Sequence, residues 1–381
     1  MGARGKIALF AVIFSWAGLC GIASAEVKLT AKQALGKQLF FDTKLSRPNG
    51  QSCATCHSPE VAFTDPDKSK PVSNGVILTL FGFRNAPTVP YSSFSPPFHY
   101  DDEGGTYVGG LFWDGRADDL TEQAEAPFLN QVEMHNHNKA QVIEDLANSS
   151  LADQFKKIYG KNALDTKNIE KAYAQVANAI AAYEGSREVN QFSSKFDYYL
   201  QGKVKLTKRE AFGLELFNGK ANCNACHPST IIGDEPAPLF TDFTYDNIGI
   251  PKNWQNPFLY LNAKYNPAKK KFIDVGLANT VALDDPIGAE AEAGKFKVST
   301  LRNLELTAPY GHNGYFKTMK QIVHFYNTRD VPEAGWEPGE VPQTVNHEEL
   351  GNLGLTDDEE NAVVTFLRTL TDGYQMPSSS K

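Results

Sequence analysis

Cys53-Ala54-Thr55-Cys56-His57 and Cys223-Asn224-Ala225-Cys226-His227 are two copies of one five-residue pattern. Cys-x-x-Cys-His is the attachment sequence of c-type haem, in which both thiols bond to the porphyrin and the imidazole binds the iron. A single copy could instead be half of a zinc site or a redox-active dithiol. Two copies that use every cysteine after residue 25 predict two covalent haem c groups, with His57 and His227 as iron ligands.

The first 25 residues have the pattern of a secretory signal peptide. Two basic residues precede a largely apolar run over 7–22, and Ala23-Ser24-Ala25 is typical of a cleavage site. The fifth cysteine, Cys20, lies inside this segment and is removed with it. The mature chain is expected to begin near Glu26 and to work in an oxidising compartment, which we predict to be a bacterial periplasm.

Charge and motif spacing limit the possible architectures and partners. Two of the 37 Lys and Arg residues lie in 1–25, so the mature chain has 35 basic residues against 45 acidic ones. This negative balance argues against nucleic acid or an anionic membrane as a partner and fits a soluble protein. The two haem motifs begin 170 positions apart, at 53 and 223, which predicts two domains over 26–204 and 205–381.

Helical patterns surround both motifs, so we expect a mainly α protein built from two cytochrome c-like haem domains with long ordered loops. Thr207 and Glu210 have capping-box spacing, and Thr356 precedes an acidic first turn, so each threonine should start a helix. The segment 58–110 is rich in Pro, Gly and Ser, which predicts a long loop system over the first haem. Helices are expected over 31–40, 120–126, 139–148, 151–159, 169–184, 208–217 and 357–370.

Seven ordered stretches identify a family resemblance that covers almost the whole mature chain. They are LFFD (39–42), SCATCH (52–57), RNAPT (84–88), FWDGR (112–116), NQVEM (130–134), FKVSTLRN (296–303) and TAPYGHNG (307–314). In this order they resemble the bacterial di-haem cytochrome c peroxidase superfamily, and within it the MauG-like branch. The resemblance implies a peroxidatic haem in the N-terminal domain and hydrogen peroxide as the small-molecule substrate.

The residue that closes the second haem separates the branches. Conventional di-haem peroxidases have a methionine about two turns into the helix that follows the Pro-Tyr-x-His segment, whereas MauG-like proteins have a tyrosine there. The corresponding residue here is Tyr326, and none of the three mature methionines falls at that position. The resemblance therefore implies Tyr326 as an iron ligand, a hard donor that lowers the reduction potential. A core aromatic on an amphipathic helix is the alternative for Tyr326, and His324 is the nearest rival ligand.

The first haem is expected to keep an open distal face. Conventional members hold a loop histidine there, and this chain has no histidine between His57 and His99, which leaves His99 as the alternative ligand. The resemblance assigns the acid–base role in peroxide cleavage to Glu133, with Gln123 and Pro127 lining the same distal pocket. A solvated carboxylate at a helix end is the alternative for Glu133.

Two further sites between the domains are implied by the resemblance. Trp113 matches a tryptophan that lies between the haems and lets two oxidising equivalents spread over both irons; packing of the domain interface is its alternative role. A calcium ion is implied, bound by the side chain of Asn85 and the backbone carbonyls of Thr307 and Pro309, since hard oxygen donors suit calcium. Asn85 and Thr307 could instead be ordinary turn residues.

The resemblance thus implies an enzyme that uses hydrogen peroxide to form a bis-Fe(IV) state and oxidises a side chain, a tryptophan, of a periplasmic partner by long-range electron transfer. One departure bears on the partner: MauG has a surface tryptophan two residues before the second motif, and this chain has Ala221. A hole could instead leave through Phe217, Tyr245 or Trp254. The alternatives are a conventional peroxidase fed by a small cytochrome or cupredoxin, and a plain electron-carrier cytochrome.

Overall fold

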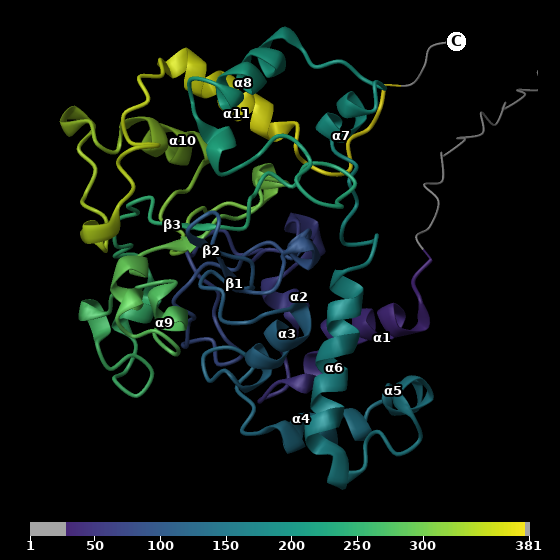
Figure 1. Ribbon diagram of the computed structural model, residues 1–381. Helices are drawn as coiled ribbons and strands as arrows, with labels where there is room; N and C mark the ends of the chain where they lie inside the picture. The colour runs from purple at the N-terminus through teal and green to yellow at the C-terminus, as the bar shows by residue number, and fades with distance from the viewer. Residues whose placement is uncertain (1–27, 378–381) are drawn as a thin grey trace, which may run out of the picture.

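The structure is a computed structural model that describes residues 28–377, so the predicted signal peptide over 1–25 lies outside the described residues. Helices predominate and the named strands form two short antiparallel pairs, which confirms the expected mainly α fold (Figure 1). No helix of the described part is both long and apolar enough to cross a membrane. The helices are α1 (Ala31–Phe40), α2 (Cys53–Cys56), α3 (Leu120–Leu129), α4 (Lys139–Ala147), α5 (Ala152–Tyr159), α6 (Ile169–Glu184), α7 (Lys195–Leu200), α8 (Lys208–Asn218), α9 (Ala278–Val281), α10 (Met319–Thr328) and α11 (Asp357–Arg368), and the strands are β1 (His99–Asp101), β2 (Thr106–Val108), β3 (Tyr245–Asp246) and β4 (Phe296–Lys297).

The N-terminal half is organised around α6, the longest of the named helices (Figure 1). This helix packs against α1 and α3, and their apolar residues share one core. The backbones of α1 and α6 come so close that a Cβ atom on Gly36 would lie 1.8 Å from the carbonyl oxygen of Ala179. Because no other residue fits at this crossing, the glycine sets the distance between the two helices.

In the C-terminal half, too, a glycine allows two helices to pack closely. Capping boxes at Thr207 and Thr356 begin α8 and α11, as the sequence predicts, and these two helices pack together in a second core. A Cβ atom on Gly213 of α8 would lie 2.1 Å from the carbonyl oxygen of Ala362 on α11. The last helix therefore packs directly against the helix that leads into the second haem motif.

The short helix α7 also belongs to the C-terminal core. Phe196 on α7 is buried among that core's residues, and its backbone N–H donates a 3.0 Å hydrogen bond to the carbonyl of Thr369. This packing brings residues on the N-terminal side of 204 into the second core.

The segment 58–110 is mostly irregular, but it ends in a hairpin that the sequence did not reveal. Strands β1 and β2 pair antiparallel with Tyr100 opposite Tyr107, and the turn between them begins with Asp102 and Glu103 and ends in two glycines. Each strand has three residues, which is too short for an alternating apolar pattern to be recognised.

A buried ion cluster joins the two halves of the molecule. Arg84 lies 2.7 Å from carboxylate oxygens of both Asp114 and Asp274, and Asp114 also pairs with Arg116 at 2.7 Å. Although burial alone would lower it, these carboxylates raise the pKa of Arg84, so the guanidinium stays charged. Arg84 precedes Asn85, so the cluster also fixes one of the predicted site residues in place.

Candidate functional site

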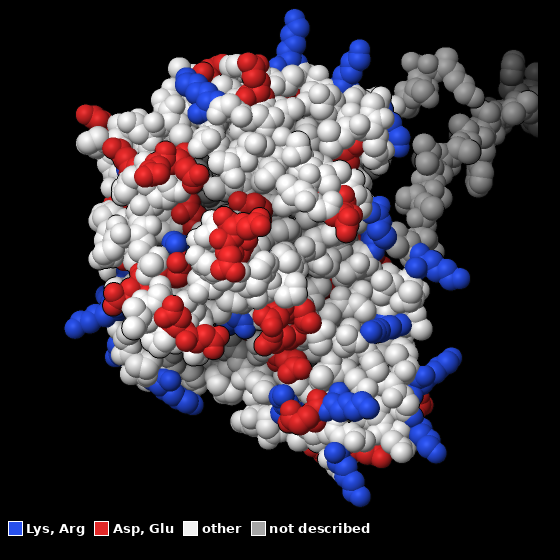
Figure 2. Space-filling model, viewed as in Figure 1, with Lys and Arg blue, Asp and Glu red and all other residues white. Residues whose placement is uncertain are grey.

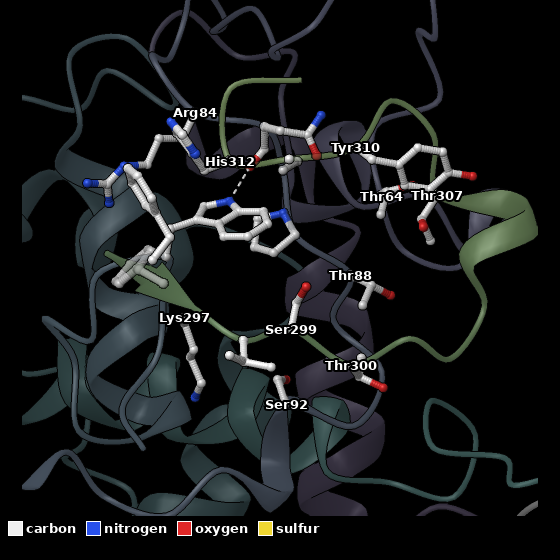
Figure 3. A pocket seen from close by; sticks show the side chains of 18 of the residues that line it. Thr64, Arg84, Thr88, Ser92, Lys297, Ser299, Thr300, Thr307, Tyr310 and His312 are labelled. Atoms are coloured by element: carbon white, nitrogen blue, oxygen red, sulfur yellow. Dashed lines mark hydrogen bonds between the residues drawn. The ribbon is translucent and has the colours of Figure 1, made fainter. Parts of the chain in front are cut away.

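One continuous cavity receives residues from both halves of the chain (Figure 3). In Figure 3 Arg84 and His312 lie at one end of this cavity, and Ser92 and Thr300 lie at the other. All fourteen residues predicted as a site from the sequence line it: Cys53, Cys56, His57, Asn85, Trp113, Gln123, Pro127, Glu133, Cys223, Cys226, His227, Thr307, Pro309 and Tyr326. Residues separated by more than 250 positions therefore share one enclosed space.

The first Cys-x-x-Cys-His motif forms one helical turn, α2, which ends at His57. The Nδ1 atom of His57 lies 3.0 Å from the carbonyl oxygen of Phe63, and burial lowers the pKa of the ring. A neutral imidazole whose Nδ1–H donates to a carbonyl keeps its Nε2 lone pair available for a metal. The donor set of two thiols and one such nitrogen facing a single cavity fits covalent haem c.

The second motif repeats this arrangement. The Nδ1 atom of His227 lies 2.8 Å from the carbonyl oxygen of Phe240, and burial lowers the pKa of His227 to about 4. Cys223 and Cys226 line the same cavity, and burial raises the pKa of each thiol to about 12. The second donor set therefore matches the first, and it again fits haem c.

Tyr326 lies on α10 and reaches the cavity from the side of the second motif. Burial and the nearby Cys226 and Asp246 raise the pKa of its phenol, and its hydroxyl makes no hydrogen bond to the described residues. His324 points elsewhere, because its Nδ1 lies 2.8 Å from a carboxylate oxygen of Glu360 on α11. Of the two candidate ligands on this helix, the tyrosine is therefore the one that faces the cavity.

Glu133 lies just after α3 and faces the half of the cavity that contains the first motif. The side-chain amide of Asn130 donates a 2.8 Å hydrogen bond to its Oε1 atom. Burial raises the pKa of Glu133, while Arg116 and Asn130 act in the opposite direction. Gln123 and Pro127 line the same region, which gives a carboxyl group the position to accept and return a proton.

His99 does not lie in this cavity. It is exposed on β1, and its Nδ1 atom is 2.8 Å from the carbonyl oxygen of Pro97. A move to the first haem site would require the β1–β2 hairpin to open. The structure thus gives no support to this alternative ligand.

Trp113 lies next to Asn85, the predicted side-chain ligand of calcium. The indole Nε1–H of Trp113 donates a 2.9 Å hydrogen bond to the carbonyl oxygen of Asn85. The side-chain amide of Asn85 donates to the carbonyl of Pro71 at 3.0 Å, which orients its carbonyl oxygen away from that contact. Thr307 and Pro309 line the same cavity. This set of neutral oxygen donors is chemically suited to a hard cation.

Three buried polar residues of the cavity had no role in the sequence prediction. His312 stacks on Phe296 with ring centroids 3.5 Å apart, and both of its ring nitrogens lack a partner among the described residues. Burial lowers the pKa of Lys297 to about 7, and Glu184 at the end of α6 has an unpaired Oε2 atom. His312 and Lys297 stand in the quoted stretches 307–314 and 296–303, whereas nothing in the sequence marks Glu184.

Three comparisons with known proteins agree with this arrangement. A family model described as di-haem cytochrome c peroxidase matches residues 30–205. The methylamine utilization protein MauG of Paracoccus denitrificans is 40% identical over 362 residues, which cover 91% of this chain and 90% of that protein. Cytochrome c551 peroxidase of Nitrosomonas europaea is 30% identical over 344 residues, which cover 88% of this chain and 79% of that protein.

The fold also matches a solved structure. The diheme peroxidase BthA from Burkholderia thailandensis superposes with a TM-score of 0.80 at 32% identity, covering 93% of this chain and 90% of that chain. The match includes both halves and therefore both haem motifs. The chain belongs to the bacterial di-haem cytochrome c peroxidase family, within its MauG-like branch, and is a peroxide-dependent di-haem oxidoreductase.

Proposed function

We propose that this protein is a periplasmic enzyme that uses hydrogen peroxide to oxidise a side chain, a tryptophan, of a partner protein by long-range electron transfer. The observation that carries the proposal is the position of Tyr326, which faces the cavity beside the second Cys-x-x-Cys-His motif. Met319, the methionine on the same helix, begins α10 two turns earlier and is buried in the C-terminal core. A phenol oxygen favours oxidised iron more than a thioether does.

The two domains, 26–204 and 205–381, divide the work in this proposal. His57 and His227 would each hold the iron of one haem c, which supplies the site of peroxide cleavage and the store of oxidising equivalents. Glu133 takes a proton from bound peroxide and returns it to the departing oxygen, and Gln123 and Pro127 shape the space around it. Trp113 provides an aromatic ring between the two haem sites. Calcium bound by Asn85, Thr307 and Pro309 would hold the segments around Trp113 together.

The test is the addition of one equivalent of hydrogen peroxide to the diferric protein. The proposal expects a reaction without prior reduction and a long-lived near-infrared band of the kind produced by charge resonance between two Fe(IV) haems. A conventional di-haem peroxidase would need to be reduced first and would then oxidise a small cytochrome rapidly. Absence of any reaction in the diferric state would overturn the proposal and favour that second function.

A further inference from the structure

Four aromatic rings form a continuous chain from the surface to Tyr245, a buried residue that directly precedes the cavity-lining Asp246. Tyr100 is 49% exposed and contacts Tyr107 edge to face at 4.9 Å between ring centroids. Tyr107 stacks on Phe98 at 5.3 Å with the planes 4° apart, and Phe98 meets Tyr245 at 6.0 Å. All three contacts lie within the range of direct aromatic packing. The four rings are therefore in contact in the structure as it stands, without any change of side-chain conformation.

The inner end of the chain lies next to the segment that carries Trp113: the phenol of Tyr245 donates a hydrogen bond to the carbonyl oxygen of Gly109 and lies against Gly115. Tyr245 is 5% exposed and directly precedes Asp246, which lines the cavity near Cys226. Tyr245 pairs with Lys297 in the β3–β4 ladder, and the backbone N–H of Lys297 donates a 2.9 Å hydrogen bond to the carbonyl of Trp113. A backbone path from Tyr245 to Trp113 therefore crosses two hydrogen bonds, from Val298 N–H to the carbonyl of Thr244 and from Lys297 N–H to the carbonyl of Trp113.

The outer end opens on an acidic surface with apolar residues in it. Asp102 and Glu103 at the hairpin tip are exposed, and so are Asp284 and Asp285 in the loop after α9. Burial, then Glu292 and Asp285, raise the pKa of Tyr107, because nearby negative charge disfavours its phenolate. In Figure 2 acidic groups gather over the part of the face where Figure 1 has β1, β2 and α9. The same loop exposes its two large apolar side chains almost fully: Leu283 (80%) and Ile287 (88%).

We propose that Tyr100, Tyr107, Phe98 and Tyr245 are the route by which electrons enter from a partner protein, and that the partner docks through a basic face around an apolar centre. The acidic rim supplies charge complementarity for that partner, and Leu283 and Ile287 supply the apolar contact. This inference rests on the proposed function, since it names the entry route and the partner class of the same enzyme. Oxidising equivalents could leave the protein by the same route in the opposite direction, so this protein does not need an aromatic residue at position 221.

The electron balance requires no additional reagent. Each hydrogen peroxide takes two electrons and two protons to give two water molecules, and both electrons come from the partner one at a time. The partner side chain loses two electrons and releases its protons to solvent. The four rings return to their starting state after each transfer.

The first test needs no partner. The holoenzyme is treated with hydrogen peroxide alone, and oxygen addition and tyrosine cross-links are mapped by mass spectrometry. We expect modification at Tyr100 and Tyr107. Trp254 is the matched control, because it is also 49% exposed and its indole is the more easily oxidised ring. Modification of Trp254 and its neighbour Tyr260, with Tyr100 and Tyr107 untouched, would overturn the route.

The second test measures electron entry from a reduced, lysine-rich cytochrome c used as a probe of basic partners. In the Tyr100→Leu/Tyr107→Leu variant, oxidation of this cytochrome should be strongly slowed while the direct reaction with peroxide is unchanged. Tyr107→Phe, which keeps the stacking on Phe98, separates loss of the phenol from loss of packing. Unchanged cytochrome oxidation in the double leucine variant would rule out this route.

The docking surface is tested with charge variants. Asp284→Asn/Asp285→Asn should lower the second-order rate with the basic cytochrome by about tenfold at low salt and abolish most of its salt dependence. The control is Glu144→Gln/Asp153→Asn, which removes two exposed charges from α4 and α5. If both double variants lower the rate with the cytochrome equally, the cytochrome does not dock specifically at the loop after α9. If the diferric enzyme does not react with peroxide, the proposed function fails, and the same variants assayed on the pre-reduced enzyme then decide the route alone.

Discussion

The side-chain amide of Asn130 donates a 2.8 Å hydrogen bond to Oε1 of Glu133, so one oxygen of this carboxyl group is held and the other faces the cavity. We expect Glu133→Gln to slow the reaction with peroxide by about 10²–10⁴-fold, because the amide cannot accept the proton of bound peroxide. Stopped-flow absorption of the diferric protein measures this rate. Both haems should remain bound. Glu144→Gln, an exposed charge on α4, is the control, and an unaltered rate in Glu133→Gln would remove this residue from the chemistry.

Tyr326 and His324 stand on the same helix but face different surroundings, and this difference can be measured. Tyr326→Met should raise the reduction potential of the second haem and abolish the near-infrared band, because a thioether stabilises oxidised iron less than a phenol oxygen does. His324→Gln should leave the potential unchanged, since its ring bonds to Glu360. Spectroelectrochemical titration and electron paramagnetic resonance give both readouts. If the two variants behave alike, Tyr326 is not the ligand.

Glu184 should make the stability of the fold depend on pH. It is 5% exposed, and burial raises its pKa from the ordinary 4.5 to about 8. Between these values the folded state binds the proton and the unfolded state does not, so stability is fully present below pH 4.5 and decreases as the pH rises through about 8. We expect Glu184→Gln to be more stable than the native protein at about pH 9, by a few kcal/mol, and similar to it at about pH 5. Denaturant unfolding at both pH values tests this, and a pH-independent difference would contradict the assignment.

The crossing of α8 and α11 should tolerate no side chain at Gly213. A Cβ atom there would lie 2.1 Å from the carbonyl oxygen of Ala362, so Gly213→Ala must separate the two helices and should cost about 1–3 kcal/mol of unfolding free energy. The matched control is Gly185→Ala at the end of α6, where the nearest atom would be 3.5 Å away and φ is −78°. Thermal unfolding followed by circular dichroism would show the difference, and equal midpoints would contradict the close approach.

Calcium binding should depend on the side-chain oxygen of Asn85. We expect one calcium ion per holoenzyme by elemental analysis, and its loss in Asn85→Ala. The hydrogen bond from Trp113 goes to the backbone carbonyl of Asn85 and survives this substitution, so the tryptophan should keep its place. Removing the ion from the native enzyme with a chelator should therefore reproduce the effect of the variant on the haem spectra. Stoichiometric calcium in Asn85→Ala would exclude this ligand set.

Local signals in the sequence predicted much of the fold. The helices α1 and α6 have the predicted bounds, 31–40 and 169–184, and the helices that begin after Thr207 and Thr356 start where their capping residues stand. These features depend on residues within a few positions of one another. The β1–β2 hairpin could not be predicted, because its strands are too short to show an alternating pattern of apolar and polar residues. Its packing comes from residues more than 140 positions away, on β3.

The candidate site divides in the same way. The haem motifs are contiguous and could be recognised directly, whereas the roles of Tyr326 and Glu133 came from the family resemblance. Glu184 could not be found, because its significance arises from burial by other elements, and its sequence neighbours give no sign of that. The aromatic chain from Tyr100 to Tyr245 also became visible only in the structure, where Phe98, beside the hairpin, meets Tyr245.

The ion cluster of Arg84, Asp114 and Asp274 separates a part of the molecule that cannot change easily from parts that can. Arg84 pairs with Asp114 of its own half and with Asp274 of the other, so loss of the arginine would leave two buried carboxylates without their main counter-charge. The cluster holds the two halves together beside the cavity, whereas the residues of the hairpin tip and of the loop after α9 are exposed. Substitutions in these exposed segments leave the buried ion pairs unchanged, so the proposed docking surface can be altered without disturbing the contact between the halves.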